Sequence, residues 1–222
     1  MKVAYRKSSQ LLICLILVCA DVSAQETARQ DTPATKTSGL QCTKTLAESP
    51  TLRGLRLGMT SDTVKTFLPS LTFGIPMPDK VQPAWANAVS FSSPLPEFKD
   101  ISDVYLFFWD KRVIYIAMDY NSISEAKSNE EFVARLSKVM GLTGEWQDIE
   151  LAHLTSDKIP KIIKYKGKRL ECNGFSIKAG LYLKQYPSIE LRDTAASEIL
   201  NERKKQREEQ ERQNKSLDNF KP

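Results

Sequence analysis

The stretch Val104–Trp109 (VYLFFW), the polar triplet Asp110-Lys111-Arg112 and the stretch Val113–Tyr120 (VIYIAMDY) decide the fold of this 222-residue chain. Aromatic and β-branched residues dominate both apolar stretches, and a short polar break between two such stretches is typical of an antiparallel hairpin. Phe107 and Phe108 would point to opposite faces of the first strand, and both are large and apolar. We therefore predict a central hairpin that is covered on at least part of each side.

Two short helices are predicted, one before and one after this hairpin. Ser128 and Glu131 have the spacing of a capping box, and apolar residues follow at helical spacing up to a glycine, which predicts a helix over 129–140. Thr60 has the features of the N-cap of an earlier helix, which Pro69 ends. Each helix has an apolar stripe, so each is expected to pack on the sheet.

The remaining strands are signalled by their turns. Asn173-Gly174 lies between two β-prone runs and predicts a second tight hairpin, and Ser188–Leu191 is a plausible last strand. Six prolines between residues 69 and 103 predict an irregular segment, with one short strand around Ala88–Ser92. The predicted fold class is α+β: an antiparallel sheet of hairpins packed by two short helices, with a polar C-terminal helix.

The first 24 residues have the order of a cleavable secretory signal. Three cations precede the apolar run Leu11–Ala20, and small residues end at Ala24, so Gln25 is the expected first residue of the mature chain. Roughly ten apolar residues are too few to cross a bilayer, which needs about 20. Lipid attachment at Cys19 is disfavoured because a valine precedes it. We expect an exported protein, periplasmic or extracellular, with no transmembrane segment after cleavage.

The expected organisation is a signal peptide (1–24), a flexible linker (25–50), the α+β domain (51–192) and a charged helical C-terminal extension (193–222). The linker has too few large apolar residues to offset the entropy of ordering it. The chain has 32 Lys and Arg and 27 Asp and Glu, and removing the signal leaves 29 and 26, a net charge near +3. That balance excludes a dedicated nucleic-acid binder, which would carry a basic stripe.

Two cysteines, Cys42 and Cys172, remain after cleavage. In an oxidising compartment such a pair favours a disulfide. The bridge would close a loop of about 130 residues, a constraint of about 4–5 kcal/mol in the chain-entropy model, and would hold the N-terminal segment on the domain. A redox-active pair would be spaced Cys-x-x-Cys, which these two are not.

The sequence lacks the patterns of common catalytic and metal sites. Its one histidine, His153, lies in an apolar setting and is interpreted as structural or superficial, and two distant cysteines give no zinc pattern. There is no Gly-x-Ser-x-Gly elbow and no glycine-rich phosphate loop. The acids Glu130, Glu131, Asp148 and Glu150 are interpreted as solvated charges, while a cation site made of carboxylates alone stays open. We predict no catalytic residue, no metal and no cofactor.

Aromatic residues and the C-terminal extension are the candidates for ligand or partner contact. The core is the favoured place for Trp85, Trp109 and Trp146, although Trp109 stands at a hairpin end where exposure is plausible. Leu217 and Phe220 follow a charged helical spacer and form a candidate apolar anchor, unless the extension is only a solvated helix. The predicted partner contacts are therefore Trp109, Leu217 and Phe220.

The stretch Leu57–Val64 (LGMTSDTV), followed later by Phe107–Val113 (FFWDKRV), resembles a pattern of small bacterial envelope domains. The pattern is similar to that of the small lipoprotein of the outer-membrane β-barrel assembly machinery and of β-lactamase-inhibitor-protein-like domains. The resemblance implies a non-enzymatic helix-and-sheet module used for protein–protein contact in the periplasm. This chain departs from the pattern in lacking the lipid-attachment cysteine and in its long proline-rich insertion.

The leading hypothesis is an exported non-catalytic protein that acts through protein contacts, with another envelope protein as its partner. A small-ligand binder with a groove beside the central hairpin and an uncharacterised hydrolase are the alternatives. The oligomeric state is left open by the sequence.

Overall fold

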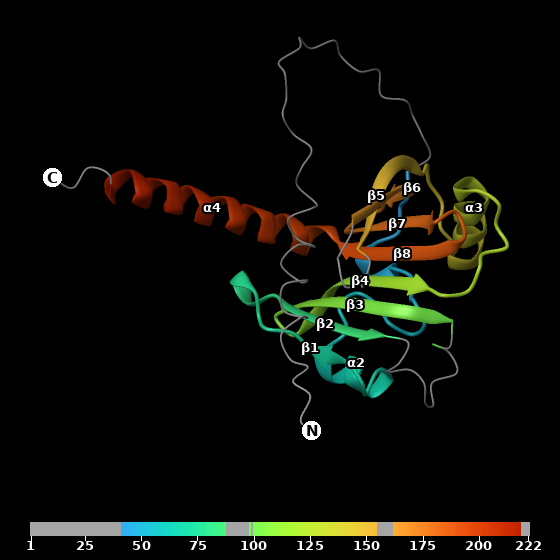
Figure 1. Cartoon of the computed structure of the whole chain (residues 1–222), viewed down its shortest axis with the longest axis horizontal. Coiled ribbons are helices and arrows are strands. Elements are labelled where there is room, and N and C mark those ends of the chain that lie inside the picture. The colour runs from blue at the N-terminus through green and yellow to red at the C-terminus, as the bar shows by residue number, and fades with distance from the viewer. Residues whose placement is uncertain (1–40, 88–97, 99, 155–161, 219–222) are drawn as a thin grey trace, which may run out of the picture.

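The computed structural model describes residues 41–87, 98, 100–154 and 162–218. It contains one eight-stranded antiparallel sheet with helices at its margins, which confirms the predicted α+β class. The strands follow the spatial order β1-β2-β3-β4-β8-β7-β6-β5 (Figure 1). In chain order the elements are η1 (Leu46–Glu48), α2 (Ser61–Phe67), β1 (Thr72–Phe73), η2 (Pro78–Lys80), β2 (Gln82–Asn87), β3 (Ile101–Trp109), β4 (Arg112–Tyr120), α3 (Asn129–Met140), β5 (Gln147–Leu154), β6 (Ile162–Glu171), β7 (Phe175–Tyr182), β8 (Tyr186–Asp193) and α4 (Thr194–Asp218).

The sheet is made of two halves with the same plan. Helix α2 precedes the meander β1 to β4, and helix α3 precedes the meander β5 to β8. The last strand of each half, β4 and β8, pair antiparallel, with Ile116 opposite Leu191. We call the boundary between β4 and β8 the seam. Within each meander, strands that follow one another in the chain pair with one another. Among the strands of the described residues, only β4 and β8 at the seam pair although they are far apart in the sequence.

One hydrophobic core runs beneath both halves. Leu106 and Phe108 of the first half and Phe175 and Ile177 of the second belong to the same cluster of buried side chains, each at most 1 % exposed. Because side chains alternate along a strand, the residues between these point to the opposite face of the sheet, which we call the open face.

Both predicted helices and the central hairpin are present. Helix α3 spans the predicted residues 129–140, the Ser128 hydroxyl accepts a hydrogen bond from the Glu131 amide (3.2 Å), and Gly141 ends it in a left-handed conformation. Helix α2 starts after Thr60, whose side chain accepts from the Thr63 amide. The hairpin turn needs only two residues, Asp110 and Lys111, both with positive φ, so Arg112 already belongs to β4.

The segment 69–103 is more regular than the sequence predicts, because it contains β1, β2 and the start of β3. Pro83 lies within β2, and its carbonyl accepts a hydrogen bond from the Gly74 amide on the side of β2 that faces away from β3. The nitrogen of Pro83 points to that same side, so the proline removes no hydrogen bond between β2 and β3. The strand predicted around Ala88–Ser92 lies outside the described residues.

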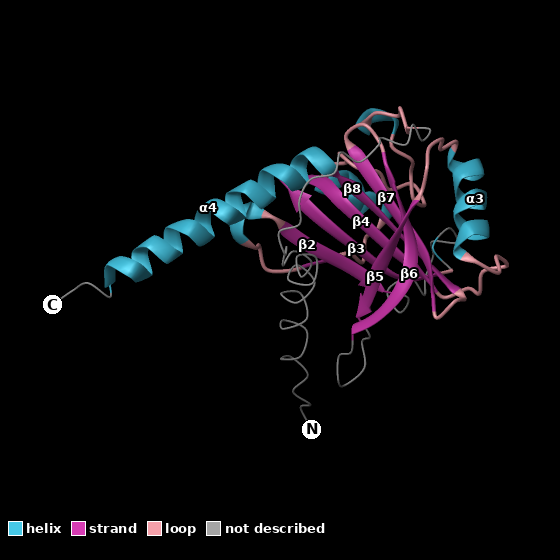
Figure 2. Ribbon diagram, turned by 90° about the horizontal axis from the view of Figure 1, so that it is seen from above, coloured by secondary structure: helices cyan, strands magenta, loops and turns pink. Residues whose placement is uncertain are grey.

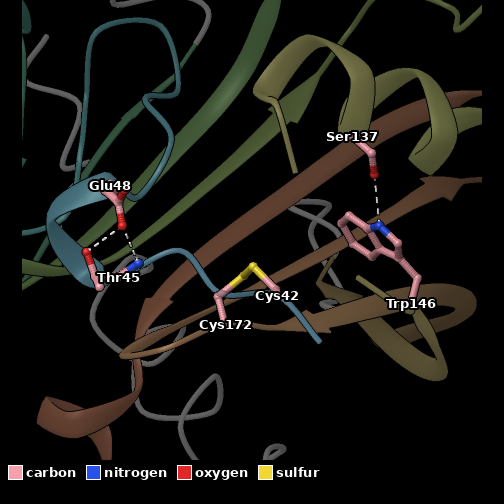
Figure 3. Close-up of a disulfide and its surroundings, with 6 residues drawn as sticks. All are labelled: Cys42, Thr45, Glu48, Ser137, Trp146 and Cys172. Carbon is pink, nitrogen blue, oxygen red and sulfur yellow. Dashed lines mark hydrogen bonds between the residues drawn. A yellow bond between two sulfur atoms is a disulfide. The ribbon is translucent and has the colours of Figure 1, made fainter. Parts of the chain in front are cut away.

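The chain is already ordered at residue 41, ten residues before the predicted start of the domain. Cys42 and Cys172 form the expected pair, with Cα atoms 4.7 Å apart (Figure 3). Thr45 bridges Asn173 in a parallel sense, and the Asn173 amide donates to the Lys44 carbonyl (3.0 Å). In the predicted Asn-Gly turn only Gly174 has positive φ. Because Asn173 pairs with Thr45 and Lys44, the turn also serves as the attachment point of residues 41–48. Residues 1–40 lie outside the described part.

Helix α4 confirms the predicted C-terminal helix. The Asp193 carboxylate caps it by accepting from the Ala196 amide (2.9 Å). Figure 2 shows α3 on one side of the sheet and α4 projecting from it in the opposite direction. The 25-residue helix is strongly polar, and among the described helices none is long and apolar enough to span a membrane.

Candidate functional site

The open face of the first half carries a group of partly exposed aromatic side chains. The backbone pairing places Trp85 opposite Tyr105 and Phe107 opposite Tyr115 on neighbouring strands. The rings of Phe107 and Tyr115 have centroids 5.2 Å apart. We call Trp85, Tyr105, Phe107 and Tyr115 the aromatic face. Helices α3 and α4 lie mainly against β6, β7 and β8, so this group stays partly accessible.

The two tyrosines of the aromatic face are held in their neutral form. Burial, followed by the carboxylates of Asp103 and Asp119, raises the pKa of Tyr105 far above its ordinary value. Burial also raises the pKa of Tyr115, with Glu190 adding to the effect. Neutral tyrosines combine a large apolar ring with a hydroxyl that donates and accepts hydrogen bonds, which suits a surface for recognition.

Helix α4 forms one border of the aromatic face. Its first turns pack on the sheet through Ala196, which is 6 % exposed. Farther along, the Arg203 guanidinium lies 5.3 Å from the ring centre of Trp109, and Arg207 forms an ion pair with Asp79 of the β1–β2 connection. The helix therefore docks on the domain along its first turns, as far as Arg207, and its remaining turns project beyond it (Figure 2).

The three predicted partner contacts have different surroundings. Trp109 is partly exposed, but the chain's own Arg203 stacks on its ring. Leu217 belongs to the last turn of α4, and Phe220 lies outside the described residues. The other two tryptophans also have different surroundings. Trp85 belongs to the aromatic face. Trp146 packs against the core, and its indole donates a hydrogen bond to the Ser137 hydroxyl at 2.9 Å (Figure 3).

A small hollow lies at the seam, at the far end of β3 from Trp109. Its volume is about 200 Å³, and it is bordered by the ends of β3 and β4 from the first half and of β7 and β8 from the second. We call it the seam hollow. The residues that line it are Ser102, Asp103, Asp119, Tyr120, Asn121, Tyr182, Tyr186 and Pro187. The chain's own Arg53 lies 5.9 Å from the ring centre of Tyr120.

The four acids that the sequence presents as solvated charges lie in ion pairs on α3 and β5. Lys168 bridges Glu130 (3.2 Å) and Asp148 (2.8 Å), which raises the lysine pKa. The other two, Glu131 and Glu150, pair with Arg135 and Lys164. The backbone of His153 lies on β5, opposite Ile163. In the described part of the chain, no three His, Cys, Asp or Glu side chains gather as metal ligands.

The sequence contains part of the signal for the aromatic face. Period-two alternation along β3 already puts Tyr105 and Phe107 on the same side, opposite the buried Leu106 and Phe108. What the sequence does not indicate is strand β2, which adds Trp85, or which of the two apolar sides of the hairpin the helices cover.

Comparison of the chain with family models, with curated proteins and with solved structures finds no match.

Proposed function

We propose that this chain is an exported, non-catalytic protein that acts through protein–protein contacts in the cell envelope, and that the aromatic face is its contact surface. The observation that carries the proposal is the partial exposure of Trp85, Tyr105, Phe107 and Tyr115 on one half of the sheet. Tryptophan, tyrosine and phenylalanine are enriched in protein interfaces, and buried aromatic anchors dominate binding energies.

The surroundings of the aromatic face support this assignment. Charged side chains border it, with Arg192 stacked 5.4 Å from the ring centre of Tyr115 and Lys178 paired with Glu190 at 3.6 Å. An apolar centre with a charged border is the usual anatomy of an interface. The resemblance of Leu57–Val64 and Phe107–Val113 to small envelope domains used for protein contact points to the same class of function.

The contact surface is tested by comparing two variants with one control. Phe107→Ser removes a ring from the aromatic face and Trp85→Ser removes a second one, while Val139→Ser changes an 84 % exposed side chain on the outer side of α3. Affinity capture from envelope extracts should yield a discrete partner with the wild type and with the control but not with the two aromatic variants. Equal capture by all four proteins contradicts the proposal.

The C-terminal extension is a separate arm of the same experiment. A chain that lacks residues 201–222 loses the predicted anchor of Leu217 and Phe220 as well as the docking contacts of Arg203 and Arg207. The matched control is Arg203→Ala/Arg207→Ala, which keeps the anchor. Partner loss on truncation but not in this control assigns the contact to the terminal anchor, and capture unaffected by truncation removes the anchor from the proposal.

Export is tested on the mature N-terminus. If the signal is cleaved after Ala24, mass spectrometry of the protein from the envelope or the medium should give a chain that starts at Gln25. A chain that stays in the cell with the bond between Ala24 and Gln25 uncleaved contradicts export. This result is independent of the contact surface.

No specific observation favours the two alternative functions. A ligand groove beside Trp109 would need its ring face, on which Arg203 stacks, and the seam hollow lies at the other end of β3. A hydrolase would need gathered acids or His153. The four acids on α3 and β5 instead form ion pairs with lysine or arginine.

A further inference from the structure

The turn between β7 and β8 departs from the turn chemistry that the chain uses elsewhere. In the described part of the chain, three turns place two consecutive non-glycine residues at positive φ: Asp79-Lys80, Asp110-Lys111 and Leu183-Lys184. Aspartate tolerates this conformation because its short polar side chain can form local hydrogen bonds, whereas leucine has no such compensation. Such turns favour glycine, asparagine or aspartate, so the turn itself does not explain the leucine.

The same leucine belongs to an exposed aliphatic surface. Leu183 is 57 % exposed, and Ile123 in the connection from β4 to α3 is 65 % exposed. The amide of Ser124 donates to the carbonyl of Gln185 at 2.7 Å, so this connection lies beside the β7–β8 turn. Side chains that stay in water add little to the stability of the core. We call Ile123, Leu183 and Lys184 the aliphatic tip.

The backbone beneath the aliphatic tip is fastened at a second point. The side chain of Asn129, the first residue of α3, accepts from the Leu181 amide at 2.9 Å and donates to the Lys166 carbonyl at 2.8 Å. Between the two fastening points, Ala126 is buried. The tip is therefore presented by a fixed backbone, which lowers the entropic cost of binding.

The charge around the aliphatic tip is positive. Lys184 and Lys127 are exposed, and neither forms an ion pair with a described residue. The neighbouring acids Glu125 and Glu131 are both paired with Arg135. The tip thus combines aliphatic side chains with cations whose charge is not compensated by an ion pair. This combination is complementary to a surface that has anionic groups outside and an apolar interior.

The surroundings of the tip suit the same kind of surface. Tyr182 and Tyr186 flank the turn on its two strands, and both are partly exposed. Tyrosine is enriched at the boundary between lipid and water, because its ring is apolar and its hydroxyl is polar. Figure 1 shows the connection from β4 to α3 at the end of the sheet opposite to the projecting α4, so α4 does not obstruct this end.

We infer that the aliphatic tip docks on the surface of a lipid bilayer. Leu183 and Ile123 enter the boundary between headgroups and acyl chains, while Lys184 and Lys127 face the lipid phosphates. A bilayer is favoured over a pocket of a protein partner because leucine is under-represented among the anchors of protein interfaces, whereas anionic headgroups attract neighbouring lysines. This inference goes beyond the proposed function and does not involve the aromatic face.

Docking is tested with the purified full chain and defined vesicles. Flotation is measured with vesicles of phosphatidylcholine, pure or mixed three to one with phosphatidylserine. Leu183→Asn and Ile123→Ser should each lower the partition coefficient on mixed vesicles about tenfold. Val139→Ser, which removes an 84 % exposed aliphatic side chain outside the tip, should leave it unchanged. Absence of wild-type binding to both kinds of vesicle, or equal binding by all four proteins, overturns the inference.

The stability of the same variant separates docking from folding. Asparagine tolerates positive φ better than leucine, so Leu183→Asn should raise the thermal midpoint while it weakens vesicle binding. A lowered midpoint would mean that the leucine serves the fold, which overturns the inference. Lys184→Gln should weaken binding to the mixed vesicles and leave binding to pure phosphatidylcholine unchanged. Binding to mixed vesicles that does not depend on Lys184 contradicts the assigned role of the cation.

The two proposals fail in different ways. If vesicles are not bound while a photo-crosslinker at Leu183 gives the same protein adduct as one at Tyr105, the tip belongs to the protein contact and the lipid inference is wrong. Phe107→Ser should leave vesicle binding unchanged. Vesicle binding that depends on Phe107 but not on Leu183 would overturn the inference and place lipid on the aromatic face, against the proposed function.

Discussion

The first half of the sheet, β1 to β4, and the second half, β5 to β8, share one plan but expose different chemistry on the open face. Along one row of paired residues, Tyr105 and Ala117 of the first half continue into Glu190 and Lys178 of the second. In this row the first half thus presents a ring, whereas the second presents an ion pair with its side chains 19 % and 26 % exposed. The tyrosines of the second half, such as the packed pair Tyr165 and Tyr182, lie in other rows.

The second half also closes part of its own open face. Gly167 and Gly180 face each other on β6 and β7, and Leu151 of the edge strand β5 packs over them. A β-carbon on Gly167 would lie 2.3 Å from the nearest Leu151 atom, so the glycine is required for this contact. The difference indicates that a repeated backbone plan sets the scaffold, while a few side chains decide which groups each half presents on its open face.

The largest expected effect tests whether the halves fold as one unit. Phe108→Ala in the first half and Phe175→Ala in the second each remove a fully buried ring, which costs about 3–5 kcal/mol. Because one core runs beneath both halves, each variant should lower a single thermal transition seen by circular dichroism. Two separated transitions, with only one lowered by each variant, would mean that the halves unfold independently.

The next effect concerns the disulfide, which links the N-terminal segment to Cys172 in the second half. Cys42→Ser/Cys172→Ser opens a link with a sequence separation of 130 and should reduce the free energy of unfolding by about 2–5 kcal/mol. Limited proteolysis should then cut within residues 41–48 before it cuts the central hairpin. An unchanged unfolding midpoint in denaturant would show that hydrogen bonds such as Asn173 to Lys44 suffice to hold the segment.

A smaller effect is expected from filling the glycine contact of the second half. Gly167→Ala should destabilise the protein by about 1–3 kcal/mol through overpacking against Leu151. Leu151→Ala makes room, so the double variant should lose less stability than the sum of the two single variants, measured by denaturant unfolding. Additive losses would mean that the clash is relieved without Leu151.

The smallest effect concerns the tyrosines and pH. The unfolded chain ionises tyrosine near pH 10, whereas burial keeps Tyr105, Tyr115 and Tyr165 protonated in the folded state. Above that pH the folded state binds more protons than the unfolded state, so stability falls as pH rises; below it the contribution is fully present. Tyrosinate absorbance should therefore rise together with unfolding, and Tyr105→Phe should shift the alkaline midpoint upward. Ionisation well before unfolding would contradict the burial of these hydroxyl groups.

Local signals in the sequence predict the elements better than they predict their arrangement. The capping-box spacing at Ser128 correctly predicts the first residue of α3, because capping depends on near neighbours in the chain. Strand β2 is not predicted because a strand tolerates Pro83 only if the proline nitrogen faces away from β3. That orientation depends on the neighbouring strands in the sheet. The pairing of β4 with β8 at the seam likewise leaves no signal in residue spacing.

The site is less predictable than the fold for the same reason. Trp109 at the end of a hairpin is a sound candidate for exposure, yet Arg203, almost a hundred residues later, stacks on it. The pairing of Cys42 with Cys172 is predictable because only two cysteines follow the predicted signal peptide, residues 1–24. The seam hollow combines residues of four strands from both halves, so it becomes visible only in three dimensions.

The central claim is that the open face of the first half, and not that of the second, contacts a protein partner. A photo-crosslinking amino acid placed at Tyr105 or at Lys178 probes two positions of the same row of the sheet in cells that produce the protein. We expect one discrete protein adduct from position 105, competed by the purified wild type, and none from position 178. Adducts of equal yield from both positions, or from position 178 alone, would contradict the claim.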